Sequence, residues 1–263
     1  MAKVSIIVPT YNMGRWLPEA LESIASNIYC DFEALVMDDG SKDDTVDVVQ
    51  GFLKDQRFRY FYQENAGKSV AVNRAFRELS GEYVTVLDAD DCLLTDGIAD
   101  RVRVFETGPS VDLVVGGFEV FVEGPTLGTR IPPAGRTADQ LVYQLLCGYK
   151  TPFSMTGCLF TKDLMLRVGL FDVGLRRAQD VDFSVRLLRM AAQFAIVPKP
   201  VFRVRKHRAR VRDRLRVRHK TFSAQLQVID SNMSGLARVY AKALAVFFQI
   251  GKALYEVRGA YLG

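Results

Sequence analysis

Tyr83-Val84-Thr85-Val86-Leu87 is a short continuous apolar run, and the three carboxylates of Asp88-Ala89-Asp90-Asp91 follow it directly. A run of this kind is typical of a strand that is buried on both faces of a parallel sheet. Such sheets bind their ligands at the carboxyl ends of the strands, where these acids would lie. Carboxylates packed this closely repel one another, and a hard divalent cation relieves the repulsion. The stretch therefore predicts an α/β sheet with a metal site at its edge, against the alternative of an acidic turn that caps the next helix at Asp96.

The sequence around this run, from Lys3 to about Gly116, alternates short apolar runs with amphipathic segments. Alternation of this kind predicts parallel strands joined by right-handed crossovers. The first half of the chain is therefore expected to form a nucleotide-binding type of α/β domain. The expected strands are 4–8, 32–37, 58–62, 83–87 and 112–116, and the expected helices are 16–28, 45–53, 70–79 and 98–105.

The second half of the chain is less regular. A loop is expected where glycine and proline cluster, from Gly124 to Gly135. Short strands are expected at 195–197 and 201–204, with Pro198 and Pro200 ending them. The other expected elements are a helix at 137–147, a strand at 155–161, a helix at 178–190 and a helix from Val211 to the end of the chain.

The composition narrows the class of protein. The chain has 263 residues, of which 49% are hydrophobic, and these values fit a globular protein with one large domain or a domain with an appendage. No run approaches the about 20 apolar residues of a membrane span, and the first residues lack the anatomy of a signal peptide, so we expect a cytoplasmic protein. The four cysteines are scattered without metal-ligand spacing, and no chemistry is assigned to them.

The net charge of +5 is unevenly distributed along the chain. The segment from Arg203 to Lys220, here called the basic strip, holds eight Arg, two Lys and one Asp, a net charge of +9 that leaves −4 for the rest. Such a strip attracts phosphates on lipids, on nucleic acid or on a phosphorylated substrate, unless it is a solvated helix without a partner. Apolar residues at helical spacing from Leu244 to Tyr255 add the alternative of a peripheral contact with the inner face of the membrane.

A second acidic group, Asp38-Asp39, ends the strand predicted at 32–37. Parallel strands would bring it to the same rim as the first group, so that one acid can bond a base or ribose while the other group holds a metal. Neither G-x-G-x-x-G nor G-x-x-x-x-G-K-[ST] is present after the first strand, and a metal must then carry the charge of a diphosphate. These absences disfavour dehydrogenases and P-loop nucleotidases.

Five motifs follow one another along the chain: Val4–Asn12, Asp38–Ser41, Asn65–Lys68 with Asn73, Gly81–Tyr83 and Asp88–Asp91. In order and spacing they resemble those of the family two glycosyltransferases with the GT-A fold. The resemblance covers roughly the first two-thirds of the chain. It implies transfer of a sugar from a nucleoside diphosphate sugar, by default a UDP-sugar, to an acceptor hydroxyl with inversion at the anomeric carbon. The acceptor is left open between a saccharide, a lipid-linked molecule and a protein. Gly169–Asp172 and Gln179–Asp182 extend the likeness.

The resemblance also implies a fold and its division. We expect a mostly parallel nucleotide-binding sheet flanked by helices, with a helical C-terminal extension. The catalytic domain would comprise residues 1–205, with a nucleotide-binding half at 1–117 and an acceptor-binding half at 118–205. Residues 206–263 would form the basic helical extension.

Individual roles are carried over onto matching residues. The resemblance implies that Asp180, at the start of the helix 178–190, is the general base. Alternatively, the carboxylate of Asp180 only stabilises the N-terminus of that helix. Gln179 stands where the motif commonly has Glu. His207 would be a third metal ligand, although the cation-rich Arg205–Arg208 around it disfavours metal binding. The remaining roles are Pro9, Thr10, Tyr11 and Asp39 for the nucleoside, Lys68 for the nucleotide, Asp88 for ribose or a metal-bound water, and Asp90 as direct ligand of Mn²⁺ or Mg²⁺.

Two rival classes of protein remain. A sugar-phosphate nucleotidyltransferase would need a glycine-rich signature with Arg near the first strand, and Tyr11–Arg15 does not supply it. A non-catalytic protein could use the basic strip to hold an anion, a membrane or nucleic acid. Such a protein would not need Asp39, Asp88, Asp90 and Asp180, which are all present. A nucleotide-sugar donor is therefore the more expected partner, and nucleic acid the less expected one.

Overall fold

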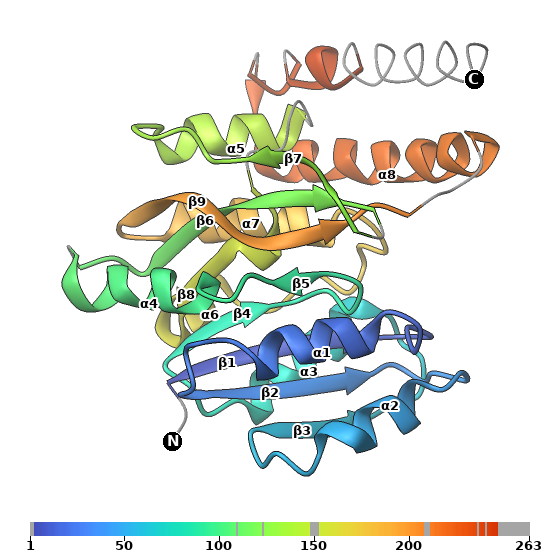
Figure 1. Cartoon of the computed structure of the whole chain (residues 1–263). Helices are drawn as coiled ribbons and strands as arrows, with labels where there is room; N and C mark the ends of the chain where they lie inside the picture. Colours follow the sequence, from blue (N-terminus) through green and yellow to red (C-terminus); the bar gives the residue numbers. More distant parts are fainter. Residues whose placement is uncertain are drawn as a thin grey trace.

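One mixed sheet forms the centre of the molecule (Figure 1). The computed structural model describes residues 3–108, 110–122, 124–147, 153–207, 211–235, 237–239 and 241–246, and only the backbone of 211–221. Within these residues the sheet has nine strands in the order β3-β2-β1-β4-β8-β6-β9-β5, with β7 paired to β6. The arrows of β2 and β6 point to the right of Figure 1, so the carboxyl ends of the parallel strands lie on that side.

The N-terminal half follows the predicted alternation of strands and helices. β1 (Val4–Thr10) pairs in parallel with β2 (Phe32–Asp38) and β4 (Tyr83–Val86), and β2 pairs in parallel with β3 (Phe58–Tyr62). Every residue of β1, β2 and β4 is buried, because helices cover both faces of the sheet. This double burial explains why these strands read as continuous apolar runs.

Helices cover the sheet in two layers, each with its own buried core. α1 (Leu17–Ala25), α2 (Thr45–Phe52) and α4 (Gly97–Thr107) supply apolar residues to one core. The opposite core takes its residues from α3 (Lys68–Glu78), α5 (Ala138–Cys147), α6 (Lys162–Val168), α7 (Gln179–Met190) and α8 (Val211–Asn232). The predicted α/β class with helices on both faces of the sheet is therefore observed.

The second half adds antiparallel strands to the sheet. β8 (Cys158–Thr161) lies between β4 and β6 (Leu113–Phe121) and runs antiparallel to both, and β9 (Phe194–Arg205) runs parallel to β6. The two-residue β5 (Cys92–Leu93) pairs with the far edge of β9. The sequence pattern predicted neither β5 nor α6, because each is too short to show a period.

Two predictions for this half are wrong. The loop expected from Gly124 to Gly135 contains the strand β7 (Thr126–Arg130), which is exposed throughout and so shows no apolar run. The two short strands expected around Pro198 and Pro200 are one strand, β9. Its register with β6 shifts at Gly117, opposite these prolines, and such an irregularity accommodates residues that cannot donate a ladder hydrogen bond.

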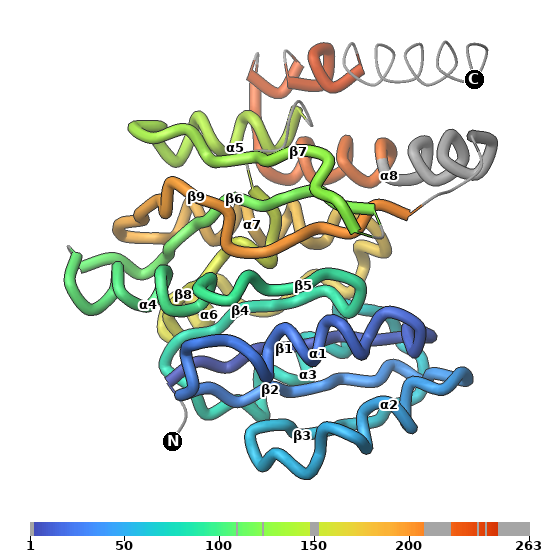
Figure 2. The backbone as a smooth tube through the Cα atoms, viewed as in Figure 1, coloured from blue at the N-terminus to red at the C-terminus, as the bar shows by residue number. Residues whose placement is uncertain are grey.

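The C-terminal part of the chain packs on the domain and is helical as predicted, except for a break after Asn232, beyond which residues 235, 237–239 and 241–246 are again helical. α8 lies against α5 and α7, with Val228 and Ile229 buried in the core they share (Figure 2). The helix stops after Asn232, and Gly235 follows with a φ of 56°. Within the described part of the chain no helix combines the length and apolarity needed to cross a bilayer. The predicted apolar face from Leu244 to Tyr255 lies outside the described residues, apart from Leu244 to Val246.

Candidate active site

A cavity of about 490 Å³ opens at the carboxyl ends of β1, β2 and β4. It is here called the donor cavity. All the residues predicted for the nucleotide line it, together with five others to which the sequence analysis assigned no role. Its lining is Pro9, Thr10, Tyr11, Met13, Asp39, Asn65, Gly67, Lys68, Ala71, Asp88, Ala89 and Asp90.

The loops that follow β1 and β2 are joined to each other beside this cavity. Asn12 has a φ of 52°, a left-handed conformation that asparagine tolerates better than most residues. Its backbone N–H donates to Ser41 Oγ at 2.9 Å, and its side-chain oxygen accepts from the Lys42 N–H at 2.7 Å. The two loops therefore form one wall of the cavity, and the exposed Tyr11 lies beside Asn12 in its lining.

Asp39 organises the loop that leads into α3. The residue is 4% exposed, and its Oδ1 accepts from Gln63 Nε2 at 2.7 Å and from the Ala66 N–H at 2.9 Å. Its Oδ2 accepts from the Gly67 N–H at 2.8 Å. These bonds leave Oδ2 with capacity for one more donor, and the residue lines the donor cavity.

Lys68 connects the acidic motif after β4 to the candidate base on α7. Its ammonium lies 2.6 Å from Asp88 Oδ1 and 2.9 Å from Asp180 Oδ2. Burial disfavours the ammonium, but the charges of Asp180 and Asp88 outweigh burial and raise the pKa of Lys68. Asp180, which does not line the donor cavity, is thus brought to its edge through Lys68.

The candidate base has one oxygen without a partner among the described residues. Asp180 Oδ2 accepts from Lys68, while Oδ1 is buried and has no hydrogen bond among the described residues. Burial raises the pKa of Asp180, Lys68 opposes the rise, and the charge of Asp88 adds to it. An unpaired carboxylate oxygen beside a cavity is placed to accept a proton from a bound hydroxyl.

His207, predicted as a third metal ligand, lies beside Asp90. Its Nε2 is 2.6 Å from Asp90 Oδ2, and its ring is 5.4 Å from the ring of Trp16. Carboxylate oxygen and imidazole nitrogen are ligands that Mn²⁺ accepts. Among the described residues no three His, Cys, Asp or Glu side chains are grouped as a metal cage, so a bound ion would take further ligands from its substrate or from water. The residues present fit a metal that arrives with a diphosphate.

Arg205 is a site residue that the sequence did not reveal, because it was counted in the basic strip. It is 6% exposed, and its guanidinium lies 4.6 Å from the ring centre of Trp16 and 4.4 Å from that of Phe121. Its Nε donates to the carbonyl of Asp90 at 3.0 Å, and its guanidinium also pairs with Glu19. Arg205 therefore holds the backbone of the acidic motif.

Asp91, the third acid of the motif, points away from the donor cavity. It is 5% exposed and accepts from the Arg205 backbone N–H at 2.9 Å. Burial, together with the charges of Asp88 and Asp90, raises the pKa of Asp91 to about 8, against the opposing effect of that N–H. Asp91 joins the motif to β9.

The basic strip is shorter than its sequence suggests. Arg205 is internal, and Arg203 pairs with Glu119 at 3.5 Å and lies 4.2 Å from the ring centre of Phe121. Lys206 and His207 are exposed. Residues 208–210 and the side chains of 211–221 lie outside the described part of the structure. Burial excludes Arg205 from an exposed anion-binding surface, and the partly buried Arg203 already pairs with Glu119.

Comparison with known proteins gives consistent matches. The family model described as glycosyl transferase family 2 matches residues 5–167. An uncharacterised glycosyltransferase of Rickettsia conorii is 30% identical over 190 residues, which are 72% of this chain and 32% of that protein. A GalNAc(5)-diNAcBac-PP-undecaprenol beta-1,3-glucosyltransferase of Campylobacter jejuni is 42% identical over 111 residues, 41% of this chain and 36% of that protein. The chain spans from 17% to 60% of the length of three Rickettsia relatives.

Solved structures with the same fold share little sequence with the chain. The structure of S. aureus TarS 1-349 in complex with UDP-GlcNAc has a TM-score of 0.71 at 18% identity and covers 93% of this chain and 71% of that one. The mannosyltransferase PcManGT from Pyrobaculum calidifontis, in complex with GDP-Man and Mn²⁺, has a TM-score of 0.66 at 20% identity, with coverage of 96% and 75%. At this identity the likeness shows the fold alone.

Proposed function

The chain belongs to glycosyl transferase family 2, and we propose that it transfers a sugar from a nucleoside diphosphate sugar to an acceptor hydroxyl. The predicted GT-A fold is confirmed by its solved neighbours. Two of these neighbours were solved in complex with UDP-GlcNAc and with GDP-Man, which supports a nucleotide-sugar donor for this chain. Among donors we propose a UDP-sugar, bound with Mn²⁺ or Mg²⁺.

The observation that carries the proposal is the position of Lys68. Its ammonium contacts both Asp88, at the wall of the donor cavity, and Asp180, at the start of α7. A transferase needs a site for the leaving diphosphate and a proton acceptor within reach of the same sugar. The contacts of Lys68 support the placement of these two functions side by side.

In the proposed reaction the residues of the donor cavity bind and orient the donor. Tyr11 and Asp39 would contact the base, with Pro9 and Thr10 beside them, and Asp88 the ribose. Asp90 and His207 would hold the divalent ion, which when bound supplies positive charge for the leaving diphosphate. Lys68 supplies a further positive charge at the same place.

Asp180 would act on the acceptor. In a single displacement the acceptor oxygen attacks the anomeric carbon from the face opposite the diphosphate, and the configuration inverts. Asp180 takes the hydroxyl proton on its unpaired Oδ1 as the new bond forms. The acceptor is a saccharide, a lipid-linked molecule or a protein, and the next subsection narrows its chemistry.

We propose that nucleotide binding and acceptor binding belong to different parts of the chain. Residues 1–117 would bind the nucleotide and residues 118–205 the acceptor, with 206–263 as a basic helical extension.

We also propose a cytoplasmic location with peripheral contact at the inner face of the membrane. Within the described residues no contact favours the alternative of a non-catalytic anion-binding protein over the transferase.

Calorimetry with UDP and Mn²⁺ tests the donor site. The variant Asp90→Ala should lose metal-dependent UDP binding, because it removes the proposed direct ligand. Asp163→Ala is a matched control, since the side chain of Asp163 is 79% exposed on α6, outside the donor cavity. Equal, metal-dependent affinities for UDP in the wild type and Asp90→Ala would contradict the assignment of Asp90 as a metal ligand.

A further inference from the structure

A second cavity, of about 270 Å³, lies beside the donor cavity. One wall is the start of α3, from Asn65 to Ser69, and the other is formed by the loop before α7 and by Gln179. Lys68 belongs to both cavities. Neither Asp88 nor Asp90 lines the second cavity, so it is separate from the proposed metal ligands.

The first wall presents the N-terminus of a helix of 11 residues. Gly67 precedes α3 with a φ of 99° and has no side chain to cap the first turn, which holds no acidic residue of its own. Asp39 accepts from the N–H groups of Ala66 and Gly67, just before the helix. The first backbone N–H groups of such a helix have no partner within the helix, and with the helix dipole they attract negative charge.

A buried hydroxyl in this wall also has no partner. Ser69 lines the second cavity and is 6% exposed, and its Oγ makes no hydrogen bond to a described residue. Buried hydroxyl groups are almost always paired, because an unpaired one has lost its water without replacement. An oxygen-rich ligand in the second cavity would supply the missing partner.

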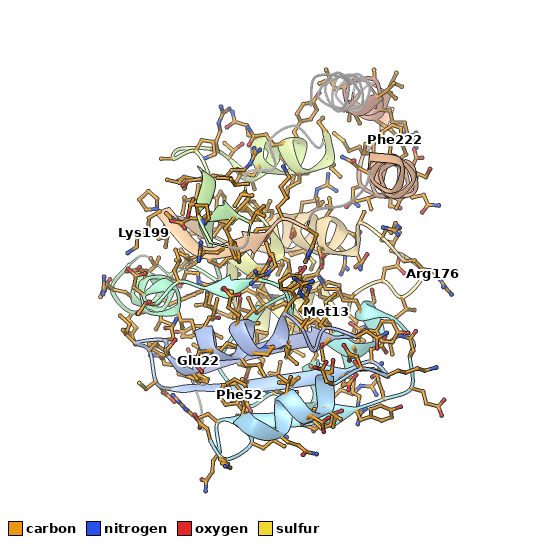
Figure 3. The ribbon with its side chains drawn as sticks, turned by 45° about the vertical axis from the view of Figure 1, so that its right-hand side comes forward. Met13, Glu22, Phe52, Arg176, Lys199 and Phe222 are labelled. Atoms are coloured by element: carbon orange, nitrogen blue, oxygen red, sulfur yellow. The ribbon has the colours of Figure 1, made fainter. Side chains whose placement is uncertain are left out.

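The facing wall carries a cation that no acid neutralises. Arg176 lines the second cavity, on the loop before α7 at the side turned forward in Figure 3. It is exposed, and within the described part of the chain it has neither an ion pair nor a hydrogen bond. The ammonium of Lys68 pairs with Asp88 and Asp180 and is assigned to the donor diphosphate, so Arg176 is the cation in this lining left for a second ligand. A guanidinium binds phosphate through two parallel hydrogen bonds.

We propose that the second cavity binds a phosphate group of the sugar acceptor. The proposal rests on the proposed function, in which the donor diphosphate lies at Asp88 and Asp90. Gln179, which lines the second cavity, precedes the candidate base Asp180 in the chain. A phosphate held between Ser69 and Arg176 would therefore place a nearby hydroxyl of the same molecule beside the base. The acceptor is accordingly a phosphate-bearing molecule.

The test uses methyl phosphate as the probe and the full chain saturated with UDP and Mg²⁺. Binding is measured by calorimetry in the wild type and in three variants. Arg176→Gln should weaken methyl phosphate binding by about tenfold or more, the scale of a lost charge-assisted hydrogen bond. Ser69→Ala should weaken it less. Arg177→Gln is the control, because Arg177 is the next residue and has the same charge but does not line the second cavity.

Affinity for UDP, measured in each variant, shows that its donor cavity is intact. Methyl phosphate that binds beside UDP and depends on Arg176 but not on Arg177 supports the proposal. Displacement of methyl phosphate by UDP would assign the second cavity to the donor diphosphate and overturn the proposal. Equal losses in the two arginine variants, or no binding in a wild type that binds UDP, would also overturn it. A wild type that fails to bind UDP contradicts the proposed function instead.

Discussion

At the scale of single residues, Asp180 and Lys68 show how the chemistry of the site depends on one close contact. The ammonium pairs with one carboxylate oxygen of Asp180 and leaves the other unpaired. A base held in this way is oriented by its partner, and the loss of its proton affinity should affect the chemical step more than donor binding.

We expect Asp180→Asn to bind UDP normally and to lose turnover by roughly two to four orders of magnitude, the usual contribution of a general base. Turnover is measured as release of UDP from a UDP-sugar in the presence of Mn²⁺, with water in place of the acceptor. Asp163→Asn serves as the control on the exposed surface of α6. Near-normal turnover in Asp180→Asn would remove the residue from the mechanism.

Glu33 is a residue of the fold whose charge matters for stability. Its carboxylate accepts from Ser5 Oγ at 2.6 Å, from Ser80 Oγ at 3.0 Å and from Arg59 at 3.1 Å. Burial alone would raise the pKa of Glu33, but these hydrogen bonds outweigh burial and lower it. A carboxyl group whose pKa is lower in the folded than in the unfolded state stabilises the fold at pH values above its unfolded pKa. That stabilisation is lost as the pH falls through its folded pKa.

We therefore expect Glu33→Gln to reduce the free energy of unfolding by about 1–3 kcal/mol at pH 7, the usual effect of breaking a buried charged hydrogen bond. The difference from the wild type should shrink as the pH falls below about 4, where the unfolded carboxyl protonates. Urea unfolding of both proteins at a series of pH values measures this difference in the free energy of unfolding. A difference that is constant with pH would show that the charge of Glu33 is not involved.

At the scale of elements, β9 connects the acidic motif to the C-terminal part of the chain. Its last residue, Arg205, bonds the backbone of Asp90, and His207 follows two residues later beside the side chain of Asp90. One strand thus determines both the backbone position of the motif and its third proposed ligand.

We predict that Arg205→Lys weakens Mn²⁺-dependent UDP binding by roughly tenfold, because lysine keeps the charge but loses the planar fork that bonds Asp90 while stacking on Trp16. Trp16 is the single tryptophan of the chain, so its fluorescence reports on the site directly. The control is Arg203→Lys, two residues earlier on β9, where the arginine pairs with Glu119 instead. Equal losses in both variants would indicate general damage to the strand.

At the scale of the whole molecule, the charge of the chain is divided between interior and surface. The cations that remain for an exposed surface follow Arg205, and residues 208–210 and the side chains of 211–221 lie outside the described structure. The sequence-based proposal of contact with an anionic membrane therefore depends on that segment.

We expect the protein to co-sediment with anionic but not neutral vesicles and to be released as salt rises, because each cation near anionic lipid contributes about 1 kcal/mol and salt screens it. Changing Arg208, Arg210, Arg212 and Arg214 to Ser should abolish binding. Vesicle binding that survives these changes, or that is absent from the wild type, would contradict the membrane contact.

The sequence alone determined those features that depend on local pattern. Strands such as β1 and β4 are buried on both faces, and their composition shows it without any partner. The acids Asp39, Asp88 and Asp90 follow such strands, and the topology of a parallel sheet brings them to one rim. The motifs around them identified the family, because their order and spacing are a property of the chain.

Only the tertiary structure decided which distant residues meet. Lys68 and Asp180 are 112 positions apart, and no local pattern shows that their side chains share a contact. Arg205 looks like one more cation of the basic strip until packing places it between Trp16 and Phe121. β9 runs past two prolines because the glycines of β6 opposite them allow the register to shift. The physical reason is the same in each case: burial, charge pairing and register are set by neighbours that are remote in sequence, and the chain must fold before those neighbours exist.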